Sequence, residues 1–148
     1  MSPTTQQRRT HDIDADLAQH PRRCILAYWH HPRFSSGGVH SNNTSIGPLW
    51  TRLHAASADV VLVGHEHIYE RFAPQTPSAQ PSATGIRQFT VGTGGKALHS
   101  LGTVKANSEV RIAGRFGVLR MTLHPTSYDW RFVADDGATL DSGSGNCV

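Results

Sequence analysis

Two histidines, His65 and His67, stand one residue apart directly after a short, mostly apolar run at residues 59–63. The run is rich in β-branched residues, as in a strand buried on both faces, and Gly64 ends it. In an extended backbone, residues i and i+2 project to the same side, so both imidazoles can face one cavity. Imidazole nitrogen suits zinc, iron, copper or nickel. The pattern therefore allows a metal-binding pair at the carboxyl end of a strand, and the alternative is a pair of surface loop histidines.

A second predicted strand, residues 24–29, places His30 at its carboxyl end. Between the two strands, residues 48–57 begin with proline and carry apolar residues at helical spacing, which predicts a helix that packs and does not catalyse. A right-handed strand–helix–strand crossover makes the strands parallel, with their carboxyl ends at one edge of the sheet. Open α/β sheets bind ligands at that edge. His30, His65 and His67 are thus expected to converge.

Three blocks of this sequence resemble a known enzyme family. Residues 64–71, Gly-His-Glu-His-Ile-Tyr-Glu-Arg, resemble the last metal-binding block of the purple acid phosphatases and related calcineurin-like metallophosphoesterases. Residues 27–32, Ala-Tyr-Trp-His-His-Pro, resemble an upstream block of that family that ends a strand in a histidine. Residues 92–95 resemble the Gly-x-Gly-Gly that follows, where bare backbone can pass close to the metal site. The resemblance covers about residues 14–148.

The resemblance implies an α/β fold, namely the C-terminal half of a four-layer α/β/β/α sandwich with a mixed sheet ending in antiparallel strands. It also implies a phosphoric ester hydrolase that acts on a phosphoester small molecule or a phosphoprotein. Two metal ions, drawn from Fe, Zn and Mn, would polarise the phosphoryl oxygens and activate a water.

Motif position assigns a role to each histidine. The resemblance implies that His30 and His65 share one metal ion and that His67 binds the other. His40 stands ten residues after His30, in a Ser/Gly/Asn-rich segment typical of a long binding loop. A family histidine at about this offset contacts the substrate phosphate or protonates the leaving group, which implies a catalytic and substrate-binding role for His40. The alternative for His40 is a solvated loop histidine.

The ligands that a two-metal site needs besides histidine are missing from this sequence. A bridging carboxylate and further oxygen ligands come, in the family, from upstream Asp-x-His, Gly-Asp and Asn-His blocks, and this chain contains none of the three. We therefore expect a truncated chain that binds at most one metal ion and is weakly active or inactive alone. Its open sheet edges would then bind the missing N-terminal half or a second copy in a dimer.

Two other readings of the histidines remain open. The chain can be a non-catalytic module in which His30, His65 and His67 form a three-histidine structural zinc site with water in the fourth position. It can also be a β-rich interaction domain with incidental histidines. Metal titration combined with thermal melts distinguishes these readings, since structural zinc raises stability strongly.

The length of 148 residues suits a single domain. Residues 1–13 are predicted to be disordered, with 14–148 forming the C-terminal part of the metallophosphoesterase domain, and a short helix is predicted within 11–20. Near the C-terminus, residues 118–123 and 128–133 alternate as antiparallel strands do.

Composition excludes some partners. The net charge of +3 comes with dispersed arginines and no basic helix, which argues against nucleic acid. No apolar run approaches the roughly 18 residues that span a bilayer, so no membrane partner is expected. Residues 1–20 lack a signal peptide, although a secreted or periplasmic location is favoured for the full-length protein. Cys24 and Cys147 would pair in an oxidising compartment and stay free elsewhere.

Overall fold

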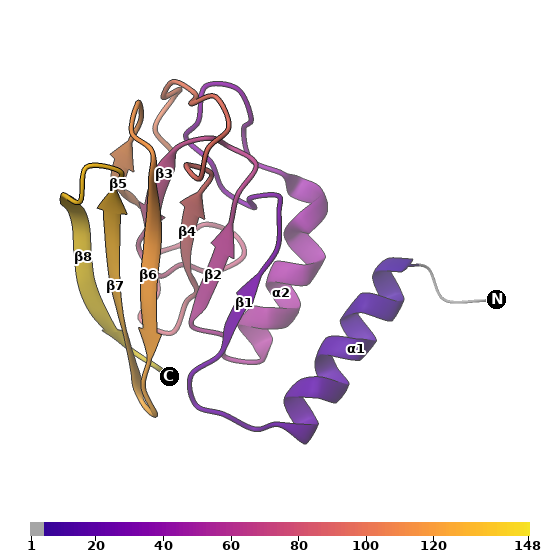
Figure 1. The fold of residues 1–148 in the computed structure, drawn as a ribbon. Helices are drawn as coiled ribbons and strands as arrows, with labels where there is room; N and C mark the ends of the chain where they lie inside the picture. The colour runs from indigo at the N-terminus through magenta and orange to yellow at the C-terminus, as the bar shows by residue number, and fades with distance from the viewer. Residues whose placement is uncertain (1–4) are drawn as a thin grey trace.

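A computed structural model describes residues 5–148 of the chain, with side chains from residue 12 onward (Figure 1). The elements follow in the order α1 (Thr5–Gln19), β1 (Leu26–Tyr28), η1 (Thr44–Ile46), α2 (Gly47–Ala55), β2 (Val60–Val63), β3 (Tyr69–Phe72), β4 (Arg87–Val91), β5 (Ser108–Ile112), β6 (Gly117–Leu123), β7 (Ser127–Ala134) and β8 (Thr139–Asn146). Among the described residues, no helix is both long and apolar enough to cross a bilayer.

Five strands form a mixed central sheet in the order β1-β2-β4-β3-β5. β1, β2 and β4 are parallel, whereas β3 runs antiparallel to both β4 and β5. The parallel pairing of β1 with β2 confirms the connection expected from the sequence. It brings the carboxyl ends of β1, β2 and β4 to one edge of the sheet, at the top of Figure 1.

A second, antiparallel sheet of β6, β7 and β8 packs against one face of the central sheet. Side chains along its strand β7 alternate between the core and solvent. Tyr128, Trp130 and Phe132 are buried, while Asp129 and Arg131 point outward. The core between the two sheets is formed by Val60, Tyr69, Phe89, Tyr128, Trp130, Phe132 and Cys147. This alternation confirms the antiparallel strands predicted near the C-terminus.

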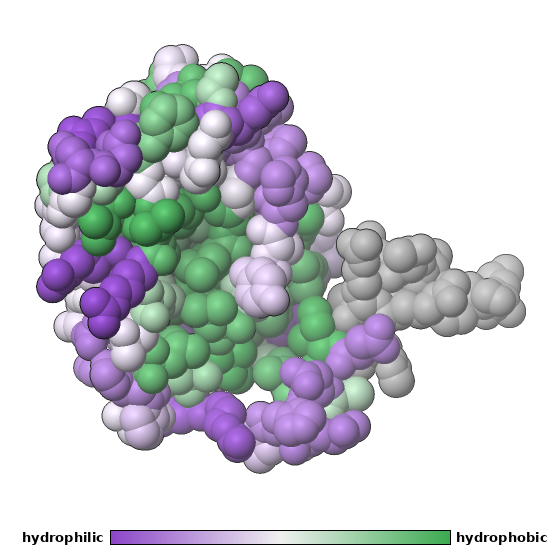
Figure 2. Space-filling model, viewed as in Figure 1, coloured by the Kyte–Doolittle hydropathy of each residue, from purple (hydrophilic) through white to green (hydrophobic). Residues whose placement is uncertain are grey.

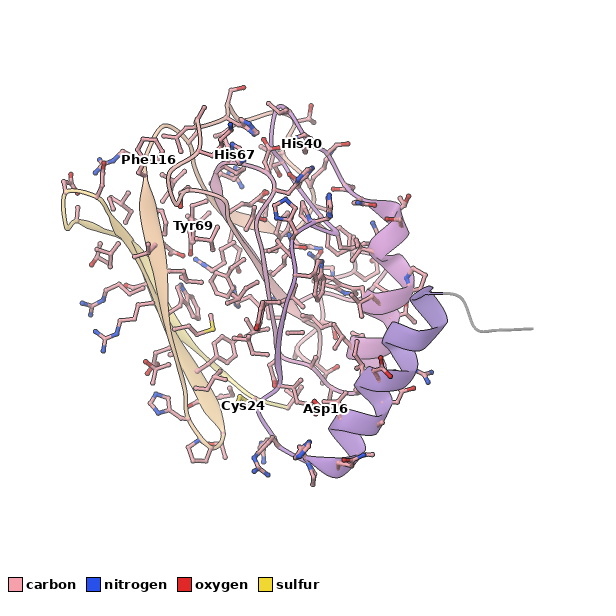
Figure 3. All side chains as sticks on the ribbon, turned by 45° about the vertical axis from the view of Figure 1, so that its right-hand side comes forward. Asp16, Cys24, His40, His67, Tyr69 and Phe116 are labelled. Carbon is pink, nitrogen blue, oxygen red and sulfur yellow. A yellow bond between two sulfur atoms is a disulfide. The ribbon has the colours of Figure 1, made fainter. Side chains whose placement is uncertain are left out.

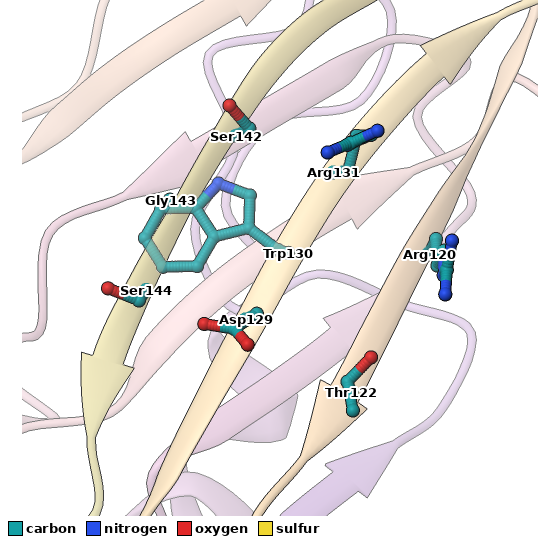
Figure 4. A pocket seen from close by; sticks show the side chains of 8 residues that line it. All are labelled: Arg120, Thr122, Asp129, Trp130, Arg131, Ser142, Gly143 and Ser144. Atoms are coloured by element: carbon teal, nitrogen blue, oxygen red, sulfur yellow. The ribbon is translucent and has the colours of Figure 1, made fainter.

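The outer face of the β6–β8 sheet is polar. Arg120, Thr122, Asp129 and Arg131 line an open hollow of about 490 Å³ on this face (Figure 4). Arg120 and Arg131 lie directly opposite each other on neighbouring strands. Like charges in this position destabilise a sheet unless water screens them, so this face is built to meet solvent.

Helices cover the other face of the central sheet. On α2, Trp50 and Leu53 are buried and pack against Phe34, Val61 and Phe72. The layers therefore follow one another as helices, central sheet and second sheet (Figure 1). This mixed α/β arrangement agrees with the predicted C-terminal half of a metallophosphoesterase sandwich.

The first helix differs from its predicted bounds. α1 begins at Thr5 rather than at residue 11, so the predicted disorder is wrong for residues 5–13. The rest of the segment predicted to be disordered, residues 1–4, lies outside the described part of the chain. The sequence before Ile13 has no apolar period to indicate a helix, although its Gln and Arg residues are good helix formers.

Strand β8 has a Gly- and Ser-rich sequence of a kind that is more typical of a loop. Its glycines make room for aromatic rings on β7. A Cβ added to Gly143 would lie 2.4 Å from a ring carbon of Trp130, and one added to Gly145 would lie 2.4 Å from Cζ of Tyr128. Gly143 and Gly145 are therefore required because a side chain at either position would collide with an aromatic ring of β7, and not because the backbone turns there.

The two sheets are joined by a hydrogen-bond cluster around Asp141 of β8. Its Oδ2 accepts from the Tyr69 hydroxyl at 2.6 Å, Arg71 Nε at 2.8 Å and Trp130 Nε1 at 3.1 Å. Burial raises the pKa of the Asp141 carboxyl, but the hydrogen bonds from Arg71 and Tyr69 outweigh burial and hold the pKa below its ordinary value. The motif residues Tyr69 and Arg71 thus fasten β3 to the second sheet.

Because the native pKa of Asp141 is lowered, its carboxylate stabilises the fold above the unfolded-state pKa of about 3.9, and this stabilisation is lost as pH falls through the native pKa. We expect Asp141→Asn to lower the free energy of unfolding by about 1.5–3 kcal/mol near neutral pH. It should also flatten the dependence of stability on pH below about pH 4. Urea unfolding across the acid range measures both, with the exposed Asp135→Asn as control. A D141N profile parallel to that of the wild type would contradict the assignment.

Cys24, just before β1, and Cys147, just after β8, form a disulfide with a Cα–Cα distance of 5.1 Å. The bridge joins the start of the central sheet to the end of the second sheet and closes a loop with a sequence separation of 123. Closing so long a loop removes entropy from the unfolded chain.

We expect the double variant Cys24→Ser, Cys147→Ser to lower the free energy of unfolding by about 2–5 kcal/mol. Urea unfolding with and without reductant measures the effect, since reductant should shift the wild type and leave the double variant unchanged. Equal midpoints for the wild type in both conditions would show that the bridge does not stabilise the fold.

Candidate metal centre

His30 and His65 meet beyond the ends of two neighbouring parallel strands. The backbone ladder continues past both strands, because Trp29 N–H donates to the Leu62 carbonyl at 3.1 Å and Gly64 N–H donates to the His30 carbonyl at 3.0 Å. This continuation fixes both segments at the sheet edge. His65 Nδ1 consequently lies 3.0 Å from His30 Nε2. The structure therefore brings these two predicted site residues together.

The backbone between His65 and His67 is bent rather than extended. His65 has a φ of 63°, in the left-handed region that costs a non-glycine residue roughly 1 kcal/mol or more. Short-range bonds from Glu66 N–H to the Gly64 carbonyl, at 2.8 Å, and from Ile68 N–H to the Glu66 carbonyl, at 2.9 Å, hold the bend. The expectation that the two histidines share a face by strand alternation is therefore wrong.

His67 has a different set of neighbours. Its Nδ1 lies 2.6 Å from the Ala97 carbonyl oxygen, and its ring stacks on His99 with centroids 4.0 Å apart. The structure therefore does not place His67 with His30 and His65. His67 nevertheless lies at the same end of the molecule as His40 (Figure 3), whose ring is next to that of His65. A metal-binding role for His67 stays a prediction.

The histidines at this end form a continuous array of rings. The His65 ring lies 4.0 Å from His40 and 4.3 Å from His31, measured between centroids. His40 in turn lies 5.6 Å from His99, which stacks on His67. Six of the ten histidines of the chain belong to this array, namely His30, His31, His40, His65, His67 and His99.

Two members of the array, His31 and His99, were not among the site residues predicted from the sequence. His31 directly follows His30, so its place in a loop at the ligand-binding edge was a usable signal. His99 follows the glycine cluster after β4, whose carboxyl end lies at the same edge. Its N–H donates to the His67 carbonyl at 3.1 Å, a contact that no local pattern in the sequence indicates.

Glu66, between the two motif histidines, is fully buried and holds the loop that carries His40. Its Oε2 accepts from His40 N–H at 2.7 Å, and its Oε1 accepts from Val39 N–H at 3.4 Å. His99 Nδ1 lies 3.3 Å from the same Oε1. A Cβ on Gly37 would lie 2.1 Å from Glu66 Cδ, so only glycine lets the loop pass this close. Glu66 thus positions His40 and His99.

Two further buried side chains fasten the start of the same loop. The Glu70 carboxylate accepts from Ser36 N–H at 2.9 Å and from the Ser108 hydroxyl at 2.6 Å. The Gln88 amide pairs with the Phe34 backbone, accepting from its N–H at 3.2 Å and donating to its carbonyl at 2.6 Å. The loop from residue 34 to residue 40 is therefore anchored along its length by side chains of the central sheet.

The glycine cluster after β4 meets the motif at one point. A Cβ on Gly92 would lie 2.1 Å from the Glu66 carbonyl oxygen and 3.0 Å from the Cα of His67. The close backbone passage expected for residues 92–95 therefore occurs at Gly92, whereas Gly94 and Gly95 have nothing near their Cβ positions.

The surroundings of His65 favour its neutral form. Burial lowers the pKa of His65, and positive charge on His40, His31 and His30 lowers it further, while Glu66 has a smaller opposing effect. A histidine must be neutral to bind a metal ion through a ring nitrogen, so this shift favours metal binding.

The described residues fit one metal ion and not two. Imidazole nitrogens of His30, His31 and His65 all lie within 4.8 Å of one another, which suits a zinc-type cation. A second such group contains His40, Glu66 and His99, but the carboxylate of Glu66 is already committed to two backbone N–H groups. Among the described side chains, that leaves no free carboxylate in the array to bridge two cations.

No family model and no curated protein matches this sequence. Solved structures share its fold, among them the following two. GAP50, the anchor in the inner membrane complex of Plasmodium, has a TM-score of 0.78 and 16% identity over 97% of this chain and 42% of its own. The purple acid phosphatase PPD1 from seeds of yellow lupin, Lupinus luteus, has a TM-score of 0.77 and 20% identity over 97% of this chain and 28% of its own. The chain thus has a metallophosphoesterase-like fold and spans less than half the length of these proteins.

We expect Glu66→Gln to loosen the His40 loop, because a neutral amide accepts backbone N–H bonds more weakly than a carboxylate and places an extra donor in a buried position. The free energy of unfolding should fall by about 2–3 kcal/mol, and the amide protons of Val39 and His40 should exchange faster. Urea unfolding and hydrogen exchange measure these effects.

Glu109→Gln is the matched control, since Glu109 makes half-exposed ion pairs whose loss should cost less than about 1 kcal/mol. Unchanged protection of both amides in the Glu66 variant would show that Glu66 does not hold the loop.

Proposed function

We propose that the chain is the C-terminal portion of a metal-dependent phosphoric ester hydrolase of the calcineurin-like, purple acid phosphatase type. The observation that carries the proposal is the 3.0 Å approach of His30 Nε2 and His65 Nδ1 at the ends of parallel strands. Both residues occupy the positions at which the resembled motifs carry metal ligands. The fold likeness to a purple acid phosphatase supports the same assignment.

Each histidine then has a role in the complete enzyme. His30 and His65 hold one cation, and His67 contributes to a second; Fe, Zn and Mn are the candidate metals. When bound, these ions supply charge for the phosphoryl oxygens and activate a water. His40 lies beside His65 with its backbone held by Glu66, so a phosphate at the first cation is within reach of its imidazole. His40 would contact that phosphate or give a proton to the leaving oxygen.

The substrate is a phosphoester of a small molecule or a phosphoprotein. The His30 and His31 side chains are exposed, so a substrate approaching from solvent can reach this centre. The disulfide between Cys24 and Cys147 supports a secreted or periplasmic location, because such bridges persist in oxidising compartments.

The ligands that this chain lacks would come from a partner bound at its open sheet edges. β1 and β6 are edge strands of their sheets. Between them lies an apolar groove of about 380 Å³, lined in part by Tyr28, Leu62 and Val118 and visible as the green hollow of Figure 2. Tyr28 and Val118 are 79% and 62% exposed, so this groove is uncovered in the isolated chain. The occupant we propose is an N-terminal half that carries the Asp and Asn ligands.

The test measures metal content and aryl phosphate hydrolysis of the purified chain, alone and with an N-terminal fragment that contains the Gly-Asp and Asn-His blocks. The chain alone should bind one cation and hydrolyse p-nitrophenyl phosphate no faster than buffer, and the fragment should restore a second cation and activity. His30→Ala and His65→Ala should lose the first cation. Full activity of the chain alone would overturn the proposed need for a partner, and unchanged metal uptake in both variants would overturn the metal site.

A second candidate function is a non-catalytic module with a structural zinc site. The sequence hypothesis named His30, His65 and His67, whereas the structure groups His30 and His65 with His31. Zinc should then raise the melting temperature strongly, and no added fragment should produce hydrolysis.

A further inference from the structure

We infer that His31 is a third metal ligand, so that His30, His31 and His65 together hold one zinc-type cation without any residue from elsewhere. This inference rests on the proposed metal site at His30 and His65 and adds a ligand that motif position does not assign. In the alternative three-histidine zinc site considered from the sequence, it puts His31 in the place of His67.

The distances between the nitrogens fit a single ion. In a tetrahedral zinc site with Zn–N bonds of 2.0–2.1 Å, the ligand nitrogens lie about 3.3 Å from one another. His30 Nε2 and His65 Nδ1 are already 3.0 Å apart, and a nitrogen of His31 lies within 4.8 Å of both. Rotation of the exposed His31 side chain would close the remaining gap.

The ring angles distinguish this group from the stacked pair of His67 and His99. The planes of His30 and His31 cross at 90°, those of His30 and His65 at 73°, and those of His31 and His65 at 52°. Rings that turn their edges toward one another can aim nitrogens at a common point. His67 and His99 instead lie stacked at 23°, an arrangement that sets the ring faces against each other.

The backbone of His31 is held in place for this role. The Trp29 indole N–H donates to the His31 carbonyl at 2.6 Å. Pro32 follows and is buried, and its carbonyl accepts from Asn43 N–H at 3.3 Å. A ligand on a fixed backbone loses little freedom when it binds a metal ion, so His31 contributes more affinity than a mobile surface histidine would.

The donor set also indicates which cation binds and what it binds in turn. Three imidazoles suit Zn²⁺, Co²⁺, Ni²⁺ or Cu²⁺ rather than Mg²⁺ or Ca²⁺, which prefer oxygen. Because all three ligands are neutral, the bound site keeps the full charge of the dication. His30 and His31 are exposed, so the fourth position is open to water or to an anionic oxygen such as that of a phosphate group.

The test titrates the purified chain with Zn²⁺ against a competing chelator and with Co²⁺ followed by its visible absorption. The wild type should bind one ion, with an intense Co²⁺ spectrum typical of a tetrahedral site. His31→Ala should weaken zinc binding at least about tenfold and change the Co²⁺ spectrum. His124→Ala, at an exposed histidine outside the array, is the control and should match the wild type.

The variants separate failure of this inference from failure of the proposed site. If His30→Ala and His65→Ala lose the ion while His31→Ala binds as the wild type does, the inference is overturned and the proposed metal site stands. If His67→Ala loses the ion and His31→Ala does not, the ligand set predicted from the sequence is the correct one. If none of the variants loses the ion, both this inference and the proposed metal site are wrong.

Folding of the His31 variant is checked by thermal melts without metal, in which an exposed side chain should make little difference. His31→Asn provides a second variant that keeps a polar side chain but has no imidazole. The same loss of affinity in both variants confirms the role of the ring nitrogen, and wild-type affinity in either one overturns it.

Discussion

The hydrogen bonds of the buried Glu66 carboxylate are the interaction on which the candidate metal centre depends. It lies at the end of β2, beneath the histidine array, and binds the loop that carries His40 through two backbone N–H groups. A buried charge is costly unless hydrogen bonds satisfy it, so the loop and the carboxylate stabilise each other. Without these bonds, the loop of residues 34–40 would lose its anchor next to His65.

The motif around Glu66 sends successive side chains to different parts of the molecule. His65 faces His30, while Glu66 and Glu70 point inward and bind the His40 loop. Tyr69 and Arg71 reach Asp141 on the second sheet. Eight consecutive residues thus connect the metal centre, the central sheet and the second sheet. The block therefore contributes both to the fold and to the candidate site, and four of its side chains, those of Glu66, Tyr69, Glu70 and Arg71, have structural roles.

The sequence predicted the framework well where side-chain periodicity is strong. The buried run of β2, the apolar stripe of α2 and the alternation of β7 each record burial, whereas the apolar run of β1 forms an edge strand that is only partly buried. The predicted parallel pairing of β1 and β2 led to the expectation that His30 and His65 lie close together. The role of the β8 glycines was not predictable, because they make room for aromatic rings of β7, a contact between strands that local sequence does not reveal.

The site was less predictable because it depends on loop conformation. One residue with positive φ, His65, turns the chain and separates His67 from the other motif histidines. The same turn leaves space beside His65 that His31 and His40 occupy from separate segments. Propensity scales describe regular elements, so neither the turn nor the approach of His99 follows from residue types alone.

The uncovered groove and the incomplete ligand set have a common location. The groove between β1 and β6 is bordered by Trp29 and Gly64, the residues directly before His30 and His65. Any polypeptide that continued either sheet past its open edge would pass beside these two residues, within reach of the cation site. The apolar surface favours such a partner because covering Tyr28 and Val118 removes exposed hydrocarbon from water. In the proposed enzyme, association and completion of the metal centre would be one event, since a strand that covered the groove would also bring its carboxylates to the cation.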